Sequence, residues 1–348
     1  MAITRTLTED TYLVTYEVGP NQSGVRLDSF LKDCYRKRSR EAMKRAISSG
    51  AITLTRNQGP HVSVGRLKPG LQLIAGDEVL VLSERKPEPE VCFDYRVLFE
   101  DETLFVIEKP ANLPVHPAGR YFFNTLLMHL RTESQKDPRL TGREYFLIHR
   151  LDKETSGVLV LTKDRAVATH LTRQFAERKT EKTYLAIVKG TPPDFFEVNL
   201  AMKRQTESLI SLKMITAPES DGGATAFTAF KRLETTGNFS LVECYPKTGR
   251  QHQIRLHLEA AGHPIVGDKL YGLPEAEALR FYDRQHLSAE AIAAMILPRH
   301  ALHAAGLKFE HPQTLQRMDI RCPLPKDLAD FLDEQRRLNG PCGKRSNT

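Results

Sequence analysis

The chain has 348 residues, an apolar fraction of 40% and a formal charge of +7. This length allows more than one domain, and the excess of Lys and Arg favours an anionic partner, with nucleic acid first. The five cysteines are scattered without C-x-x-C spacing, which argues against a disulfide framework and a cysteine-based zinc site. No apolar run reaches the length of a signal-peptide core or a membrane span, so we expect a cytoplasmic protein with no membrane partner.

The first segment with domain character runs from residue 24 to 82. Apolar spacing around Leu27 and Leu31 predicts a helix, and Ser39 is a candidate N-cap for a second helix over residues 39–48 that ends at Gly50. Alternating residues predict strands over 51–55 and 78–82. Residues 83–90, charged and containing two prolines, predict a linker.

Basic residues concentrate in this first segment. Between residues 24 and 50 there are eight basic and three acidic residues, a net charge of +5. A solvated helix face would explain such a cluster, but the grouping at one helix start and one helix face suits phosphate contact better. The candidate RNA-binding residues are Arg26, Arg36, Lys37, Arg38, Arg40, Lys44 and Arg45.

A larger domain is expected over residues 91–332. A strand over 104–107 precedes a proline-punctuated loop over 109–117, and helical spacing begins at Phe123. Residues 145–148 and 158–162 predict two buried strands around the polar loop His149–Gly157. That loop is too charged to be buried without partners, although an ordinary surface loop would have the same composition.

The second half of this domain predicts mainly strands. Helical spacing over 166–175 is followed by strand patterns over 181–190, 208–214, 224–233 and 239–245, with turns that favour antiparallel pairing. Residues 254–258 fit both periods, and we choose a helix. Residues 274–299 suggest an inserted helical pair, and residues 339–348 a disordered tail. The fold class is therefore α+β, with a large mixed, mostly antiparallel sheet and a small N-terminal α/β domain.

Several motifs in order carry a resemblance to a known family. His-Arg-Leu-Asp-x-x-Thr-Ser-Gly at 149–157 resembles the active-site signature of the RluA-type pseudouridine synthases. Residues 109–117 and 248–258 also match family segments, except that Asn112 replaces a usual glycine. Residues 24–82 resemble an S4 RNA-binding domain, apart from a longer stretch over 56–67. The resemblance covers residues 24 to about 332 and implies an enzyme that isomerises uridine in RNA without metal or cofactor.

The resemblance also assigns roles to residues. Asp152 matches the catalytic aspartate. The sequence leaves three roles open for it: attack on the ribose, attack on the base, or abstraction of a sugar proton. Arg255 matches its ion-pairing arginine, with a phosphate contact as the alternative, and Tyr184 matches the active-site tyrosine. The expected substrate-binding residues are Arg150, which fills the space of the extruded uridine, His149, Thr155 and Gly157, which shape the loop, and Arg250 and His252.

Three functions remain open from the sequence. A monomeric synthase acting on large-subunit ribosomal RNA comes first, with transfer RNA as the alternative substrate. A non-catalytic RNA-binding protein of the same fold would lack Asp152, which is present. A carboxylate-dependent hydrolase would need a second acid near Asp152, and Glu154 is available.

Overall fold

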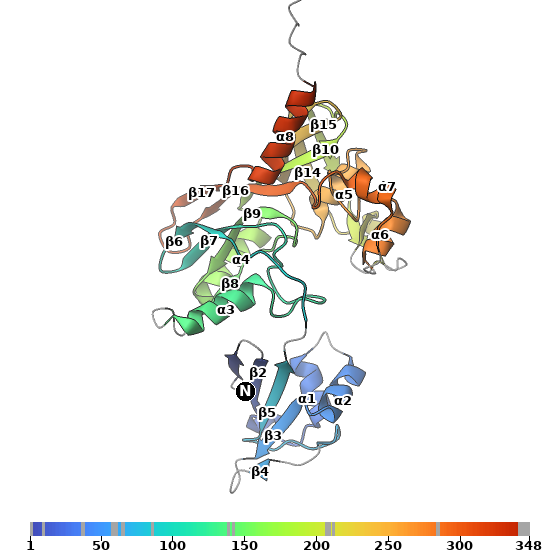
Figure 1. Ribbon diagram of the computed structural model, residues 1–348. Helices are drawn as coiled ribbons and strands as arrows, with labels where there is room; N and C mark the ends of the chain where they lie inside the picture. The colour runs from blue at the N-terminus through green and yellow to red at the C-terminus, as the bar shows by residue number, and fades with distance from the viewer. Residues whose placement is uncertain are drawn as a thin grey trace, which may run out of the picture. The chain divides into compact units, whose positions relative to one another are not determined.

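The computed structural model describes residues 3–8, 11–35, 39–56, 62–63, 67–84, 87–137, 140, 143–205, 210, 213–282 and 286–339 (Figure 1). The chain divides into two compact units. Unit 1 comprises Met1–Glu88 and Arg131–Thr141, and unit 2 comprises Pro89–Leu130 and Gly142–Thr348. Among the described helices, none combines the length and apolarity that a membrane crossing requires.

Unit 1 contains a five-stranded antiparallel sheet in the order β1-β2-β5-β3-β4. Its strands are β1 (Ile3–Leu7), β2 (Thr11–Glu17), β3 (Ile52–Arg56), β4 (Val62–Ser63) and β5 (Glu78–Glu84). The sheet thus begins ahead of Gly24, with two strands that the sequence did not suggest. β2 alternates weakly, and Val14 and Tyr16 are its buried members, so its strand character depends on pairing with β5.

The helices of unit 1 form as the sequence predicts. After the 3-10 turn η1 (Pro20–Gln22) come α1 (Leu27–Cys34) and α2 (Arg40–Ser48). Ser39 caps α2, because its hydroxyl accepts a hydrogen bond from the backbone N–H of Ala42 at 3.2 Å. Gly50 then leaves the helix with φ +81°. Leu27, Leu31 and Ile47 pack in the core cluster shared with the strands.

Unit 2 is built on a ten-stranded sheet in the order β11-β14-β15-β10-β16-β9-β7-β6, with β17 beside β16 and β8 beside β9. Among the described strands β16 and β9 form the one parallel pair, so the expectation of a mixed, mostly antiparallel sheet in an α+β fold is confirmed. The strands are β6 (Arg96–Glu100), β7 (Leu104–Lys109), β8 (Phe146–Leu147), β9 (Ser156–Thr162), β10 (Glu181–Lys189), β11 (Phe195–Asn199), β14 (Phe227–Thr236), β15 (Phe239–Pro246), β16 (Leu302–Glu310) and β17 (Arg317–Arg321). A separate hairpin joins β12 (Met202–Arg204) to β13 (Met214–Thr216).

β9 lies at the centre of unit 2, and every one of its residues is buried. Leu159 and Leu161 pack in the cluster on one face of the sheet, and Val158 and Val160 pack in the cluster on the other. Both faces are covered, which explains the continuous apolar run in the sequence. The loop that precedes β9 is therefore attached to a strand that is packed on both faces.

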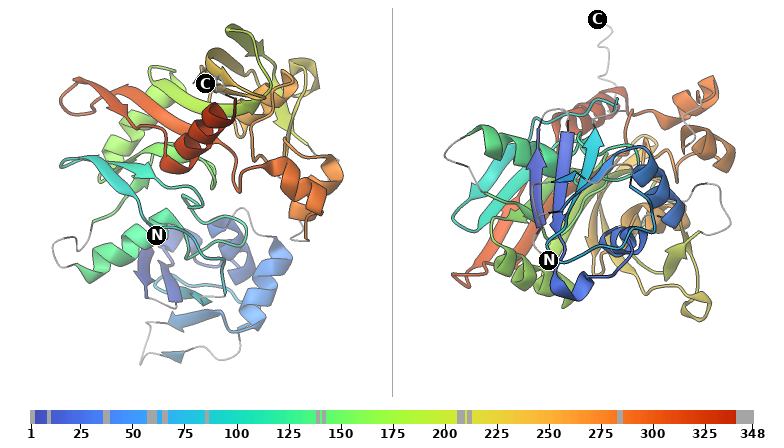
Figure 2. Two further views of the ribbon diagram at one scale, coloured as in Figure 1. Left: turned by 45° about the horizontal axis from the view of Figure 1, so that its top comes forward. Right: turned by 90° about the horizontal axis from the view of Figure 1, so that it is seen from below.

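The helices of unit 2 are α3 (Leu126–Lys136), whose first turns belong to this unit, α4 (Arg165–Ala176), α5 (Gln253–Ala260), α6 (Glu275–Tyr282), α7 (Ala289–Met295) and α8 (Lys326–Asn339), with the 3-10 turn η3 at Glu219–Asp221. The helix over 254–258 and the inserted helical pair are thus confirmed. Figures 1 and 2 show α6 and α7, in orange, together at one side of unit 2, and α3 and α4, in green, at the other. α8 covers the sheet, with Leu328, Phe331 and Leu332 in the core.

Some expected boundaries differ in the structure. α3 starts at Leu126 rather than Phe123, because the N–H groups of Leu126 and Leu127 bond to the carbonyls of Pro114 and Val115 in the proline-punctuated loop. Of residues 145–148, only the two of β8 pair with β9. The strand expected over 208–214 lies mostly outside the described residues. Asn339 ends α8 instead of starting a tail, and residues 340–348 lie outside the described part of the chain.

Candidate active site

The site begins with a close approach between two parallel strands. Gly157 of β9 pairs with Ala304 of β16, and Ala304 pairs with Tyr184 of β10. Gly157 has φ +114°, and a Cβ atom added there would lie 2.2 Å from the carbonyl oxygen of Ala304. Only glycine fits at this position. The row across three strands brings the loop before β9 next to Tyr184.

The loop that carries Asp152 is held at both ends. At its start, the Nε2 atom of His149 accepts a hydrogen bond from the backbone N–H of Val160, and the ring stacks on Phe175 of α4. Burial lowers the pKa of His149 to about 3, so the imidazole is neutral and free to accept this bond. At its end, the hydroxyl of Thr155 lies 2.8 Å from Nε2 of His300. His149, Thr155 and Gly157 thus contact the protein itself.

A fully buried lysine supports the middle of the loop. The ammonium group of Lys109 donates to the carbonyl oxygens of Pro110, Leu113 and Lys153 at 2.7, 3.1 and 3.1 Å. Burial lowers its pKa to about 7, against the opposing effect of the Asp152 charge. Sequence reasoning quoted this residue only as part of a motif. The structure shows that it ties the 109–117 loop to the residue beside Asp152.

Arg255 reaches Asp152 from α5. His252 is the N-cap of this helix and a non-glycine residue with φ 57°. Such strain is common at functional sites. The side chain of Gln253 fixes this start, because its amide donates to Phe227 O and Thr228 Oγ1, both at 3.0 Å. The first turn of α5 is thereby fastened to β14, and Arg255 is aimed at the catalytic loop.

Asp152 and Arg255 form a hydrogen-bonded ion pair, with Nη1 at 3.0 Å from Oδ2. Burial would raise the pKa of the Asp152 carboxyl, but the neighbouring His252, Arg255 and His300 hold it below its usual range. Burial lowers the pKa values of His252 and His300 to about 4, so both imidazoles are neutral at neutral pH. Arg255 is therefore the permanent charge that keeps Asp152 ionised.

Asp268 is a second carboxylate on the same arginine. Its Oδ2 accepts from Nε of Arg255 at 2.6 Å and its Oδ1 accepts from Nη2 at 2.9 Å. The backbone N–H groups of Leu270 and Tyr271 donate to Oδ1 at 2.9 and 3.0 Å. The sequence analysis gave Asp268 no role, because nothing in the local sequence reveals its partner.

Tyr184 borders Asp152 from the sheet. Burial, and then the charge of Asp152, raise the pKa of its hydroxyl above the usual range. The phenol therefore carries its proton at neutral pH, when the site can use it as a donor. Its ring is partly buried against both neighbouring core clusters.

Asp152, Tyr184 and Arg255 line one cleft of about 630 Å³. Asp152 is the single carboxylate among its lining residues, and the remaining charged groups are basic: Arg150, Arg178, Lys182, Lys247, Arg250 and Arg255. Arg150 and Arg250 are both exposed, and the Nε atom of Arg250 donates to Thr225 O at 3.3 Å. A cleft with a single carboxylate and a cationic rim suits an anionic polymer that presents one group to Asp152.

Glu154 does not complete a pair of catalytic acids. Its carboxylate accepts from Lys269 Nζ at 2.8 Å and from the backbone N–H of His300 at 3.1 Å, and it is absent from the described lining of the cleft. Hydrolysis by two carboxylates needs both of them at the substrate. The geometry therefore speaks against the hydrolase alternative.

The candidate RNA-binding residues all belong to unit 1. Arg26 forms an ion pair with Asp28 at 3.0 Å, and Lys44 approaches Glu41 at 3.7 Å. Arg40 and Arg45 lie on α2. Arg36, Lys37 and Arg38 fall outside the described residues.

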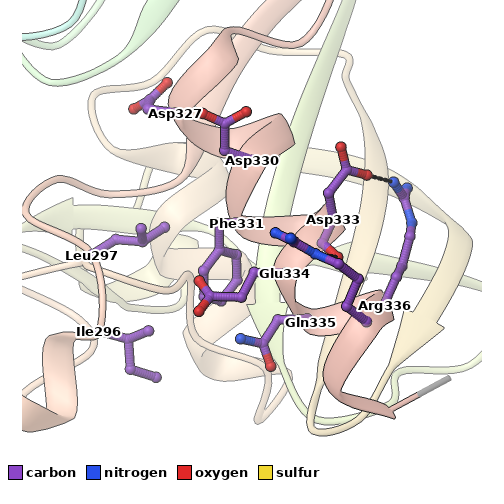
Figure 3. Close-up of a pocket in the computed structure, with 10 residues that line it drawn as sticks. Ile296, Leu297, Asp327, Asp330, Phe331, Asp333, Glu334, Gln335 and Arg336 are labelled. Carbon is purple, nitrogen blue, oxygen red and sulfur yellow. Dashed lines mark hydrogen bonds and ion pairs between the residues drawn. The ribbon is translucent and has the colours of Figure 1, made fainter. Parts of the chain in front are cut away.

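A second, larger hollow of about 1120 Å³ lies along α8 (Figure 3). Three of its four acids have cationic partners: Asp327 pairs with Arg299, Asp330 with Lys326, and Asp333 with Arg336. The fourth, Glu334, is exposed. Acids outnumber cations in the described lining of this hollow, which does not suit an anionic polymer. The cleft around Asp152 is therefore the better candidate for the site.

Comparison with known proteins shows the family of the chain. The family model described as RNA pseudouridylate synthase matches residues 103–260. Ribosomal large subunit pseudouridine synthase D of Neisseria meningitidis is 32% identical over 335 residues, covering 93% of this chain and 82% of the relative. The chain belongs to the RluA-type RNA pseudouridine synthases. Enzymes of this family are isomerases that convert uridine to pseudouridine in RNA.

Other relatives of the RNA pseudouridine synthase family extend the match. Ribosomal large subunit pseudouridine synthase C of Escherichia coli O6:H1 is 31% identical over 327 residues, covering 91% of this chain and 94% of the relative. The solved structure of human RNA pseudouridylate synthase domain containing 4 aligns with a TM-score of 0.53 at 29% identity, covering 69% of this chain and 92% of that chain. The matched family segment contains Asp152, Tyr184 and Arg255.

Proposed function

We propose that this synthase isomerises specific uridines in large-subunit ribosomal RNA, with Asp152 as the catalytic carboxylate. The observation that carries the proposal is the ionised Asp152, bonded to Arg255 inside a cleft with a basic rim. Relatives named as synthases of types C and D match with nearly equal identity, so the class of RNA is supported and the individual uridine is not. Action on ribosomal RNA places the protein in the cytoplasm. All three catalytic residues come from one chain, which is consistent with a monomer.

The chemistry needs no redox change. The bond between C1′ of the ribose and N1 of uracil breaks, a bond from C1′ to C5 forms, the proton on C5 is lost and N1 gains one. Attack on the ribose, attack on the base and abstraction of a sugar proton all require an ionised Asp152. Arg255 supplies that ionisation, and the protonated Tyr184 can stack on uracil and donate a proton.

Entry of the uridine into the cleft requires its extrusion from the RNA. Unstacking costs a few kcal/mol, and a side chain that fills the vacated space offsets part of this cost. Arg150 suits this role, because it lies two residues before Asp152, is exposed and lines the cleft. Arg250 and His252 line the same cleft and would contact the nucleotide.

The N-terminal segment 24–82 would act as an S4-like RNA-binding domain, followed by a linker and the catalytic domain. The linker expected over 83–90 starts only after β5, because Ser83 and Glu84 pair with β2. The support for the RNA-binding domain is the +5 charge between residues 24 and 50. Counterion release from phosphate contacts would provide affinity without sequence information. Base pairing and shape around the target uridine would then be read at the cleft.

The test is a map of pseudouridine in total RNA from cells with and without the gene. We expect one or more large-subunit positions to lose the modification, and complementation by the wild-type protein but not by Asp152→Asn to restore it. Loss confined to transfer RNA would replace the substrate assignment. An unchanged map would contradict the proposed function.

A further inference from the structure

Asp268 takes no part in lining the cleft, yet it is bonded to the residue that controls Asp152. It is 1% exposed, and its carboxylate spans Nε and Nη2 of Arg255 at 2.6 and 2.9 Å. Two backbone N–H groups complete its hydrogen bonding. A carboxylate so enclosed cannot reach the substrate. Its influence on the reaction must pass through Arg255.

The consequence concerns the oxygens of Asp152. A guanidinium group prefers to bind a carboxylate with two parallel hydrogen bonds. In Arg255 the edge formed by Nε and Nη2 is taken by Asp268, which leaves Nη1 for Asp152. Nη1 bonds to Oδ2 alone, and the described residues donate no hydrogen bond to Oδ1. One oxygen of the catalytic carboxylate is thus held, and the other remains available to the substrate.

We propose that Asp268 is a positioning residue, which occupies the forked edge of Arg255 so that the arginine binds one oxygen of Asp152 and leaves the other to react. The inference rests on the proposed function of Asp152. Without Asp268 the guanidinium would turn and close on both oxygens. The catalytic carboxylate would stay ionised, but it would be bound too tightly and placed wrongly.

The charge of Asp268 is as necessary as its shape. Burial would raise the pKa of Asp268, but Arg255 and the two backbone donors hold it below its usual range. Other titratable groups also lie around the cluster. His252 and His300 are neutral at neutral pH, Tyr184 and Tyr271 keep their protons, and Glu154 and Lys109 complete the set. Two ionised carboxylates therefore compete for one guanidinium, and neither captures it completely.

The test compares Asp268→Asn with wild type in the full-length protein. Single-turnover rate at saturating RNA, RNA affinity, thermal transition and the pH profile are measured. We expect the rate to fall by roughly 10- to 100-fold, the scale of a misplaced catalytic group, with affinity within about twofold, since Asp268 does not face the RNA. The acidic limb of the profile should not move upward, because Arg255 still holds Asp152 ionised and a nearby negative charge is gone.

A matched control is Asp327→Asn. Asp327 binds Arg299 through the same two-bond geometry, at 2.7 and 2.9 Å, and has no bond to Asp152 or Arg255. It is a strict control, because Arg299 also donates to the carbonyl of Glu154 in the catalytic loop. We expect Asp327→Asn to keep a near wild-type rate. An equal loss in both variants would mean that Asp268 supports the fold alone and would overturn the inference.

Arg255→Lys gives a second test if Asp268→Asn does not fold. Lysine keeps the charge and lacks the fork, so we expect the same loss of rate with an unmoved acidic limb. A normal rate for Asp268→Asn or for Arg255→Lys, or an upward shift of the acidic limb in either, contradicts the inference. Asp152→Asn separates the two proposals. If Asp152→Asn is inactive while Asp268→Asn is normal, only the positioning role fails, whereas an active Asp152→Asn removes the proposed function itself.

Discussion

Replacement of Arg255 by alanine tests the ionisation of Asp152 directly. The Nη1 and Oδ2 atoms are 3.0 Å apart. At this separation two unit charges attract by about 5–6 kcal/mol at an effective dielectric constant of about 20. That energy corresponds to about 4 pKa units as an upper bound. Asp268 shares the same cation, so the part that acts on Asp152 is smaller, in the range of roughly 1–3 units.

The expected result is a shift of the pH profile. Once Arg255 is gone, Asp152 has lost its bonded, permanently charged partner. His252 and His300 are neutral at neutral pH, so burial raises the pKa of Asp152 and Asp268 adds repulsion. We expect the loss of the Arg255 charge to raise the apparent pKa of Asp152 by roughly 1–3 units, and the repulsion from Asp268 to raise it further. The acidic limb of the single-turnover rate should rise into the accessible range, and the rate near pH 6 should fall more than the rate near pH 8.

The assay is single-turnover formation of pseudouridine at saturating RNA between about pH 5.5 and 9, beside an RNA titration and a thermal transition. Loss of a buried pair costs about 3–5 kcal/mol, so a lower Tm is expected as well. Arg255→Lys is the control, because its retained charge should return the acidic limb to its wild-type place while the rate stays low. If Arg255→Ala keeps the wild-type profile and rate and loses only RNA affinity, Arg255 is a phosphate ligand and the reasoning fails.

Four further outcomes follow from the structure. Asp152→Asn should keep a cooperative thermal transition and RNA affinity while losing product, and near-normal turnover would remove it from the chemistry. Gly157→Ala should lower Tm and abolish activity, because its Cβ would lie 2.2 Å from a backbone oxygen at φ +114°; a wild-type Tm would refute the close approach. Replacement of Arg36, Lys37 and Arg38 by Glu should weaken RNA binding and flatten its salt dependence. The control replaces Arg317, Arg321 and Lys326 by Glu. An unchanged slope of log affinity against log salt concentration would argue against the RNA-binding domain. The free energy of unfolding should fall as the pH drops from about 6.5 toward 4. The pKa values of the buried His252, His300 and His303 are lowered to about 4, so the unfolded chain binds protons before the folded protein does. Equal denaturation midpoints at pH 7.5 and pH 5 would contradict this.

The sequence predicted those elements whose pattern is local. The apolar run of β9, the Ser39 cap of α2 and the glycine after it each carry their own signal within a few residues. The helix around Arg255 was predictable too, since its i,i+4 spacing outweighed a competing alternation. β1 and β2 were not, because their strand character comes from pairing with each other and with β5.

The candidate site shows the same division. Asp152, Tyr184 and Arg255 could be named from motifs, and the structure brings all three to one cleft. Lys109 lies in a segment that matches the family, but the sequence did not show that either Lys109 or Asp268 acts near Asp152. Their roles depend on contacts between segments far apart in the chain, such as the bond from Lys109 to the carbonyl of Lys153. No local pattern encodes that kind of partnership.

The parallel pairing of β9 with β16 has a consequence for how the protein is made. The loop around Asp152 closes on residues about 145 positions later, through Thr155 with His300 and Ser156 with His303. A ribosome that adds roughly 5–20 residues per second delivers the first partner many seconds before the second. A nascent chain therefore contains Asp152 and Arg255 before the cleft can form. We therefore expect catalysis to begin only after β16 has been made, and a premature stop before β16 to leave Asp152, Tyr184 and Arg255 without a formed cleft.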